Sequence, residues 1–502
     1  MMEALTKLKA RLAEISDLNK VSGVLGWDQR TMMAPRGAVG RSEQLATLSK
    51  IAFERFVDPE TGRLLEAVAP LETELPYDSD DASLIRYVRR DHEKAIKVPV
   101  ELEAEMARSA AIAQEGWTQA RKESDFSLFL PHLERMIGLK RRYIDCLIKE
   151  GEDPYDVLLD DFEPGMKGAE VEAVFNNLKK DLVPLIAAIR EKEDQVSDDV
   201  LRGHFPIEKQ KAFSWSLIEM LGANREAWRL DPTVHPFASN GGPDDIRLTT
   251  RFYEDYLCPS LFATMHEFGH GLYEHQVARE LERSPLCRGT SLGLHESQSR
   301  LWENLVGRSR PFWSFAYPKL QAVWPDALGR VEMETFYRAI NRVSASFIRV
   351  EADEATYALH IILRFGMERE IIAGKIALKD VAEVWRERFK SLFGIDVPDD
   401  ARGVLQDVHW SAGLFGYFPT YALGSIISSQ IWEKITESMP DIHAQLAAGE
   451  FAPLREWLRE NLHRHGRKFT PTETMQRLVG GPIDVGPFVR YLTSKFGEIY
   501  QL

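Results

Sequence analysis

The sequence predicts a mainly α-helical protein that also contains a small β-sheet. Two observations support this prediction. Apolar residues recur with a helical period in long segments, which often begin at proline and end at glycine. The alternation typical of half-buried strands is scarce, and its best example is residues 246–252, which follow Pro243 and two glycines.

The expected helices follow in order along the chain. Residues 1–20 place leucine and isoleucine at helical spacing among charged residues, which is typical of an amphipathic helix rather than of a signal peptide. Pro99 begins a helical segment that runs to about Ser124, and Pro131 begins another that Gly151 ends. Further helices are expected at 168–192, 259–280, 332–373, 379–392 and 441–463.

The composition restricts the class of protein. The 502 residues are 44% hydrophobic and 28% charged, as in a globular protein with a sizeable core. The net charge of −14 argues against partners that need a basic surface, so we expect neither nucleic-acid nor membrane binding. No apolar run approaches the roughly 18 residues of a membrane span. Three scattered cysteines favour reduced thiols and a cytoplasmic protein.

The segment His266-Glu267-Phe268-Gly269-His270 has the spacing that a catalytic zinc site requires. Residues four apart share one face of a helix, so His266 and His270 can bind one Zn²⁺ through their imidazoles. Glu267 is then placed to act as general base toward a water that the metal acidifies. The motif also occurs by chance in unrelated proteins. Its five residues alone therefore leave open both a zinc site and a pair of histidines that are simply packed or solvated.

A catalytic zinc needs a third protein ligand and one open position. His295 and Glu296 follow His270 after a loop, just before another helical segment, and either can return to the metal. The spacing favours Glu296 slightly and leaves His295 as the alternative. Gly269 costs roughly 1 kcal/mol inside a helix. We expect either the close approach of another backbone or of substrate, or simple helix packing, to explain it.

Six short motifs occur in a fixed order: His235-Pro236-Phe237, Asp245-Ile246-Arg247-Leu248-Thr249, His266-Glu267-Phe268-Gly269-His270, His295-Glu296-Ser297, Ile348-Arg349-Val350-Glu351-Ala352-Asp353 and Gly403-Val404-Leu405-Gln406-Asp407-Val408-His409-Trp410. With Trp27-Asp28-Gln29 and Met32-Met33-Ala34-Pro35, they make nearly the whole chain resemble the carboxypeptidase Taq family (M32) of metallocarboxypeptidases. Each motif is weak alone, whereas all six in order are specific. No motif position departs from the family pattern.

The resemblance implies His266, His270 and Glu296 as the metal ligands and Glu267 as the base. It implies a large helical zinc-peptidase body with a deep active-site cleft and a small sheet near the metal helix. It also implies a homodimer, and one catalytic unit over residues 1–502, within which we assign no internal boundary. The implied activity is the release of single C-terminal amino acids from peptides with broad specificity, supported by Zn²⁺ or Co²⁺.

An exopeptidase must recognise the terminal carboxylate of its substrate, and arginine can contact a carboxylate through two parallel hydrogen bonds. Arg349, Arg247 and Arg300 are the candidates. Arg349 is the first choice, because the family motif that contains it is associated with the substrate cleft. Each of the three can instead be an ordinary ion-pair residue.

Other polar residues are candidates for contacts with substrate. His409 and Tyr421 can donate hydrogen bonds to the oxyanion that forms when water attacks a peptide carbonyl. His235 is expected to line the cleft or to hold a loop. A structural role for each is the simpler alternative.

Two aspartates and one strand complete the set of candidates. Asp245 and Asp353 can each accept the outer N–H of a ligand histidine. Asp245 can equally brace the short strand. The strand 246–252 can also add an extended peptide along its edge.

Two alternative functions remain open. A helical zinc oligopeptidase or dipeptidyl carboxypeptidase shares the metal helix and the distal glutamate, and the size of the products distinguishes it. A catalytically silent peptide-binding protein is the remote alternative. The intact Glu267 and the complete ligand set argue against that alternative.

Overall fold

The computed structural model describes residues 1–502, most of which are helical. One three-stranded sheet accompanies the helices, so the predicted fold class is confirmed. The chain divides into two compact units, each assembled from separate segments. Unit 1 comprises Met1–Ala95, Ser197–Ile340 and Ser428–Pro482, and unit 2 comprises Ile96–Val196, Asn341–Ile427 and Ile483–Leu502. A single catalytic unit over the whole chain stays a prediction.

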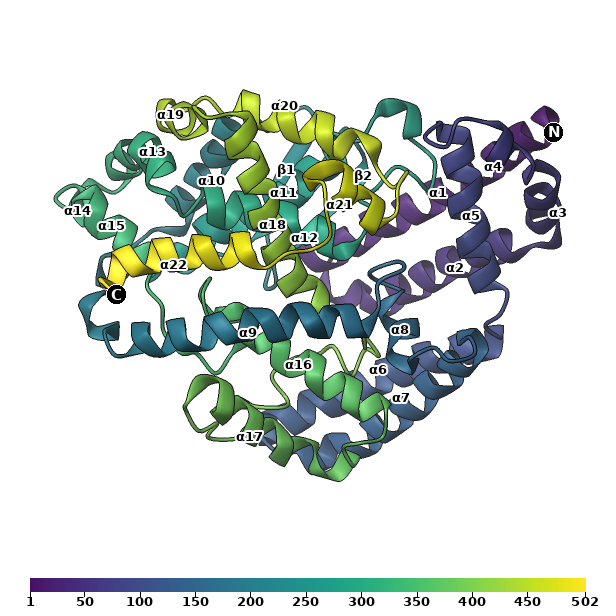
Figure 1. Cartoon of the computed structure of the whole chain (residues 1–502), viewed down its shortest axis with the longest axis horizontal. Coiled ribbons are helices and arrows are strands. Elements are labelled where there is room, and N and C mark those ends of the chain that lie inside the picture. Colours follow the sequence, from purple (N-terminus) through teal and green to yellow (C-terminus); the bar gives the residue numbers. More distant parts are fainter. The chain divides into compact units, whose positions relative to one another are not determined.

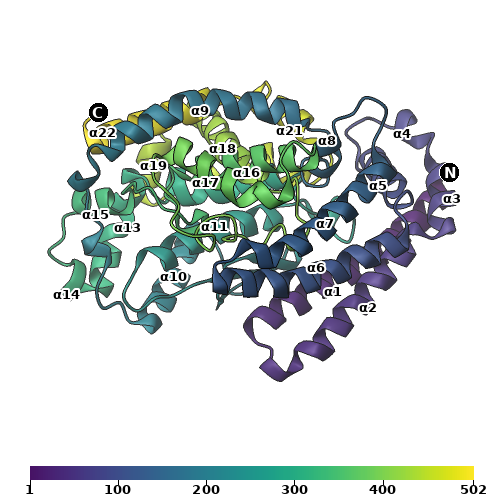
Figure 2. The ribbon, with the colours of Figure 1, turned by 90° about the horizontal axis from the view of Figure 1, so that it is seen from below.

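Unit 1 begins with α1 (Met2–Thr31), the amphipathic helix expected at the N-terminus, which continues beyond residue 20. It lies beside α2 (Ala38–Val57), as Figures 1 and 2 show. Its buried leucines pack in an apolar cluster with side chains of α3 (Pro59–Val68). The other helices of unit 1 are α4 (Leu71–Glu74), α5 (Asp80–Ala95), α10 (Ile207–Leu221), α11 (Cys258–His275), α12 (Leu292–Arg300), α13 (Arg310–Val323), α14 (Pro325–Leu328), α15 (Met333–Ile340), α19 (Ile442–Ala448), α20 (Ala452–Asn461) and α21 (Pro471–Val479).

The sheet of unit 1 contains β1 (Trp228–Pro232), β2 (Ala238–Gly242) and β3 (Asp245–Thr250) in the order β1-β3-β2. β3 is the predicted strand, and it pairs in parallel with β1 and antiparallel with β2. The hypothesis that a peptide adds along β3 is therefore wrong, because both of its edges already have partners. The sheet packs against α11 at Gly271, where a Cβ atom would meet the side chains of Ile246 and Leu248 at 2.8 Å.

Unit 2 contains a helical hairpin of α6 (Val100–Glu123) and α7 (Phe126–Leu147). Asp125 accepts a hydrogen bond from the Ser127 backbone N–H, so α7 begins before Pro131 and contains that proline. The remaining helices are α8 (Pro154–Leu159), α9 (Gly168–Arg190), α16 (Tyr357–Ile372), α17 (Val381–Phe393) and α22 (Gly486–Tyr500). α18 (Pro419–Ser438) begins in unit 2 and ends in unit 1.

Three predicted helices end earlier or divide. The segment 259–280 leaves its helix after His275, and the Ala278 N–H then bonds the Arg464 carbonyl. The segment 332–373 forms α15 and α16 with an irregular stretch between them, and 441–463 divides into α19 and α20 at Gly449, whose φ is 80°. In each case a tertiary contact or a left-handed backbone overrides the apolar period.

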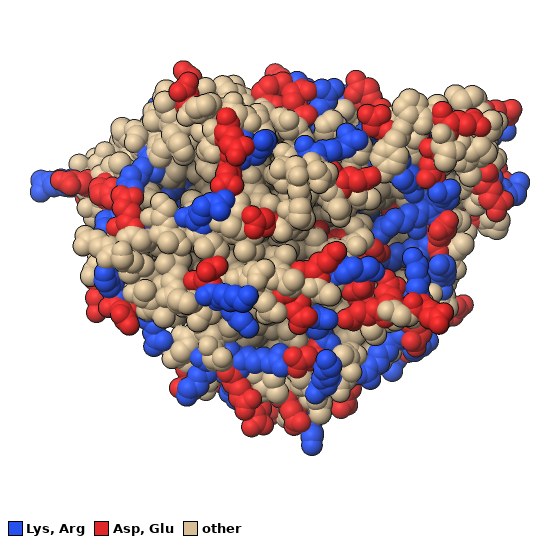
Figure 3. Space-filling model, in the orientation of Figure 1, with Lys and Arg blue, Asp and Glu red and all other residues tan.

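The surface carries charges of both signs. Figure 3 shows lysine and arginine side chains mixed with aspartate and glutamate side chains over the face it displays. None of the helices combines the length and the apolar character that a bilayer-spanning segment needs.

Candidate metal centre

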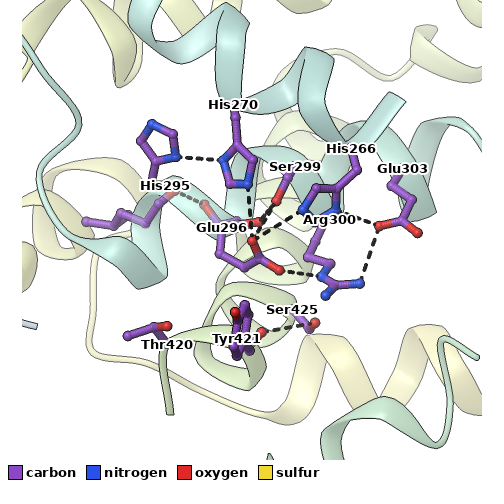
Figure 4. Close-up of polar contacts among 12 residues, drawn as sticks. His266, His270, His295, Glu296, Ser299, Arg300, Glu303, Thr420, Tyr421 and Ser425 are labelled. Carbon is purple, nitrogen blue, oxygen red and sulfur yellow. Dashed lines mark hydrogen bonds and ion pairs between the residues drawn. The ribbon is translucent and has the colours of Figure 1, made fainter. Parts of the chain in front are cut away.

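Three potential metal ligands converge in unit 1. His266 and His270 lie one turn apart on α11, and Glu296 lies on α12. Their Nε2 atoms are 3.6 Å and 3.3 Å from Glu296 Oε2, and all three donor atoms lie within 4.8 Å of one another. Figure 4 shows the two imidazoles and the carboxylate pointing toward a common position. Two imidazoles and one carboxylate are a donor set of catalytic divalent metals.

Gly269 explains how α12 brings Glu296 to this position. A Cβ atom at residue 269 would lie 2.3 Å from the carbonyl oxygen of Gln298 and 2.6 Å from the Cα of Ser299. The glycine therefore permits the backbone of α12 to touch α11. The approaching backbone belongs to another helix, so close backbone approach and helix packing, two of the explanations left open by the sequence, describe the same contact.

The outer nitrogens of both histidines have partners. His266 Nδ1 lies 2.8 Å from Glu303 Oε2, and His270 Nδ1 lies 2.6 Å from His295 Nδ1. Since each Nδ1 is engaged in a hydrogen bond, each Nε2 can present its lone pair to a metal. His295 therefore contacts the outer nitrogen of His270 and is not one of the three converging donors. His266, His270 and Glu296 fit a bound divalent ion.

The proposed aspartate partners of these histidines are wrong. Asp245 instead pairs with Arg247, whose Nε and Nη2 lie 2.9 Å from its two carboxylate oxygens. Asp353 accepts hydrogen bonds from the backbone N–H groups of Ser344, Ala355 and Thr356. Glu303 and His295 take their place. Glu303 follows Glu296 by seven residues, about two helical turns, and that spacing is the sequence signal for it.

Arg300 holds the carboxylates of the site. Its Nε donates to Glu296 Oε1 at 2.8 Å, and its Nη1 lies 3.3 Å from Glu303 Oε2. Burial acts to raise both carboxylate pKa values, but the Arg300 charge and the imidazoles outweigh it. They hold the pKa of Glu296 well below its usual range and lower that of Glu303 to about 2. Arg300 therefore braces Glu296, a role that the sequence did not indicate.

Glu267 lies on α11 between the two histidines. Its side chain is buried, and its Oε2 has no hydrogen-bond partner. Burial raises the pKa of Glu267 to about 7. A carboxyl group in this state can accept and return a proton near neutral pH.

A second cluster of candidate residues lies in unit 2 around Asp407. Arg349 donates to Asp407 Oδ1 from Nε at 3.0 Å and from Nη2 at 2.7 Å, and to the Tyr357 hydroxyl from Nη1 at 2.9 Å. Arg364, which is fully buried, donates from Nε to Asp407 Oδ2 at 2.7 Å. These ion pairs contain two guanidinium groups and one carboxylate, so Arg349 and Arg364 share Asp407 as their partner.

His409 and Tyr421 belong to the same cluster. His409 Nε2 lies 3.4 Å from the Tyr421 hydroxyl, and the Arg349 guanidinium lies 4.9 Å from the centre of the Tyr421 ring. Burial lowers the pKa of His409 to about 3, so its imidazole is neutral. The cluster thus combines a cation with neutral hydrogen-bonding groups.

The other two candidates belong to the sheet region of unit 1. Arg247 is on β3, and its guanidinium lies 4.5 Å from the centre of the Trp27 ring while it pairs with Asp245. His235 is exposed in the loop between β1 and β2. Neither position by itself indicates a contact with substrate.

Comparison with known proteins defines the class of the protein. Residues 7–496 match the family described as Carboxypeptidase Taq (M32) metallopeptidase. The chain is 38% identical over 495 residues to thermostable carboxypeptidase 1 of Thermus thermophilus, covering 97% of each chain. It is 35% identical over 491 residues to carboxypeptidase 1 of Bacillus subtilis, covering 98% of this chain and 97% of the relative.

Solved structures agree with these relatives. The M32 carboxypeptidase of Deinococcus radiodurans superposes with a TM-score of 0.96 at 37% identity over the whole of both chains. The Pyrococcus furiosus carboxypeptidase superposes with a TM-score of 0.94 at 34% identity, over 98% of this chain and 99% of that one. The protein is a metallocarboxypeptidase that acts on peptides and uses a divalent metal. The chain belongs to the carboxypeptidase Taq (M32) family.

Proposed function

We propose that this metallocarboxypeptidase is a zinc enzyme that releases single C-terminal amino acids with broad specificity. His266, His270 and Glu296 hold the metal, and Glu267 is the general base. One observation carries the proposal. Two imidazole nitrogens and one carboxylate oxygen lie within 4.8 Å of one another, next to a buried glutamate with a free carboxylate oxygen. Co²⁺ is expected to substitute, because it accepts the same donors.

The chemistry follows from these residues. When bound, the metal supplies a Lewis acid that acidifies water and polarises the peptide carbonyl. Glu267 accepts a proton from the attacking water at its free Oε2 and then delivers it to the leaving amine. The burial that raises the pKa of Glu267 to about 7 supports both transfers. Arg300 keeps Glu296 ionised and oriented.

Arg349 is the proposed receptor for the terminal carboxylate of the substrate. Its hydrogen bonds use three of its five N–H groups, and it shares the Asp407 carboxylate with Arg364. A substrate carboxylate would supply a second acidic partner for the two guanidinium groups, and holding it would fix which peptide bond is hydrolysed. His409 and Tyr421 are proposed as hydrogen-bond donors to the carbonyl under attack. Arg247 and His235 remain candidates for contacts along the peptide.

Assembly and location are proposed on different grounds. The homodimer rests on the family resemblance alone. A cytoplasmic location is consistent with three cysteines that are all unpaired. The net charge of −14 supports the proposal that neither nucleic acid nor an anionic membrane is a partner.

The proposal is tested with zinc-loaded wild type and Glu267→Gln on N-blocked peptides of increasing length. Each peptide is supplied with a free C-terminus and with a C-terminal amide, and the products are weighed by mass spectrometry. Wild type should release single amino acids from the free peptides only. Glu267→Gln should keep one equivalent of zinc and lose about 10²- to 10⁴-fold in kcat, the usual contribution of a general base.

The alternatives predict different products. Release of dipeptides or internal fragments would support an oligopeptidase or dipeptidyl carboxypeptidase instead. Binding of peptides without any turnover would support a silent peptide-binding protein. Unchanged hydrolysis by Glu267→Gln would refute the role of that residue.

A further inference from the structure

His270 is held by a second histidine rather than by a carboxylate. If Nε2 of His270 faces the metal, its Nδ1 must carry the hydrogen. The atom opposite, Nδ1 of His295 at 2.6 Å, must then be an acceptor. His295 therefore carries its hydrogen on Nε2, and that atom lies 3.0 Å from Glu274 Oε1, which accepts it.

The Glu274 carboxylate accepts hydrogen bonds from three partners: His295, Gly289 and Asn240. It lies on α11, one turn beyond His270, so His266, His270 and Glu274 follow each other at four-residue spacing along one helix face. Its Oε1 also accepts the Gly289 backbone N–H at 3.1 Å, and its Oε2 accepts the Asn240 amide at 3.3 Å. Lys20 of α1 in turn donates to the Asn240 side chain. The bonds from Gly289 and Asn240 therefore hold the carboxylate in place independently of His295.

We propose that Glu274 and His295 are positioning residues that fix the tautomer and ring orientation of His270 and so set the affinity of the metal site. This inference rests on the proposed ligand set. The two ligand histidines have different partners. The Glu303 carboxylate contacts His266 directly, whereas His295 lies between His270 and the Glu274 carboxylate. The nearly parallel rings of His270 and His295, 23° apart with centres separated by 4.6 Å, suit this hydrogen bond.

His295 can be substituted with little disturbance of the fold, because it lines a cavity. His295 and Glu274 line a cavity of about 640 Å³ in unit 1, together with Lys20, Asn240, Cys287 and Arg288. The His295 side chain is 22% exposed rather than packed on all sides. Shorter side chains at residue 295 should therefore be tolerated by the fold.

Two amides can separate the two hydrogen bonds of His295. Asparagine places its Oδ1 near the former Nδ1 and keeps an acceptor for His270, but it does not reach Glu274. Glutamine extends to the former Nε2 and can contact Glu274, but it leaves the His270 N–H without an acceptor. His295→Leu removes both bonds, and Glu274→Gln keeps the shape and removes the charge. His275→Asn, on the same helix and bonded to the Pro243 carbonyl, is the matched control.

The experiment measures the zinc dissociation constant of each variant by competition with a chelator. The Co²⁺ absorption spectrum and the thermal midpoint of the apo-protein are recorded beside it. His295→Gln and His295→Leu should bind zinc about 10- to 100-fold more weakly, as is usual when such a partner is lost. His295→Asn should lie at least about fivefold closer to wild type and retain the cobalt spectrum, and His275→Asn should match wild type.

The order of affinities decides the matter. Asparagine binding zinc more tightly than glutamine and leucine, with similar apo midpoints, supports the inference. Equal affinities, or the reverse order of the two amides, would overturn it. His270→Ala separates this from the proposed ligand set: undiminished zinc binding by that variant would refute the ligand set itself. Loss of zinc by His270→Ala with a flat His295 series would refute only the role of His295.

Discussion

Gly269 is the residue at which the helices carrying the proposed metal ligands touch. A methyl group there would lie 2.3 Å from the Gln298 carbonyl oxygen, a backbone atom that cannot rotate away. We expect Gly269→Ala to lower the free energy of unfolding by about 1–3 kcal/mol, as overpacking usually does. It should also weaken zinc binding, because α12 must shift and carries Glu296 with it. Urea denaturation and chelator competition measure the two effects.

A glycine in open space provides the control for this substitution. Gly26 lies within α1 and has no atom within 4 Å of the position of a Cβ. Gly26→Ala should leave stability unchanged or raise it by up to about 1 kcal/mol, because alanine is the better helix former. Equal stabilities of the two variants would show that the contact at Gly269 does not constrain the helices.

The residues of the proposed metal site differ in how far the sequence reveals them. The spacing of His266, Glu267 and His270 predicts one helix face, because helical geometry alone sets it. Arg300, Glu303 and Glu274 escaped prediction as partners, because their roles depend on how α11 and α12 meet. Their spacings become informative only when the contact at Gly269 is known, because that contact determines which faces of α11 and α12 lie against each other.

At the scale of elements, a buried ion pair fastens α22 to the irregular stretch before α16. Lys495 Nζ lies 2.6 Å from Glu354 Oε2, and the two side chains are 6% and 4% exposed. Lys495→Met leaves Glu354 charged and buried, so we expect a loss of about 3–5 kcal/mol in unfolding free energy. Chemical denaturation at neutral pH measures it.

A double-mutant cycle tests the same ion pair. Because Lys495→Met with Glu354→Gln removes both charges, the double variant should be more stable than Lys495→Met alone. Additive losses from the two single substitutions would mean that the charges do not interact. In that case α22 would be held by its apolar residues and by other polar contacts, such as the bond from the Val343 N–H to the Tyr500 hydroxyl.

The elements divide into those that the local sequence determines and those that distant contacts determine. The helix predicted from Pro99 to about Ser124 is observed as α6, because a proline and a left-handed serine mark its ends. The expected helix 332–373 fails between α15 and α16. There the Arg349 N–H donates to the Gln406 side chain, which in turn donates to the Phe347 carbonyl. A partner 57 residues away leaves no local pattern to read.

At the scale of the whole molecule, Asp407 should make stability depend on acid pH. Although burial opposes it, Arg349 and Arg364 hold the pKa of Asp407 well below its usual range. The folded protein then binds fewer protons than the unfolded chain, whose aspartates titrate near about 3.9. The stabilisation is complete above that pH and is lost as the pH falls below it.

The substitution Asp407→Asn tests this dependence. We expect a loss of about 3–5 kcal/mol at neutral pH, because two buried guanidinium groups lose their carboxylate. The difference from wild type should be constant from neutral pH to about pH 5 and shrink below about pH 4. Denaturation curves at several pH values measure it, and Asp396→Asn, at an exposed pair with Lys390, is the control. A difference that does not change with pH would contradict the assignment.

Removal of the metal should act first on the part of the molecule that supplies the ligands. A ligand that binds only the folded state stabilises it by about 2.7 kcal/mol at a concentration of 100 times its dissociation constant. Treatment with a chelator should therefore lower the thermal midpoint by a few degrees. Hydrogen exchange should accelerate in α11 and α12, which carry the proposed ligands, more than in α3, which packs in the N-terminal apolar cluster.

Two variants make this measurement specific to the ligand set. Glu267→Gln keeps every proposed ligand, so zinc should protect its α11 and α12 as in wild type. His266→Ala with His270→Ala removes two of the three donors, so added zinc should protect neither helix. Protection of α11 by zinc in this double variant would place the metal elsewhere. Without the two imidazoles, Glu296 is the one proposed ligand that remains, and a single carboxylate does not make the three-donor site.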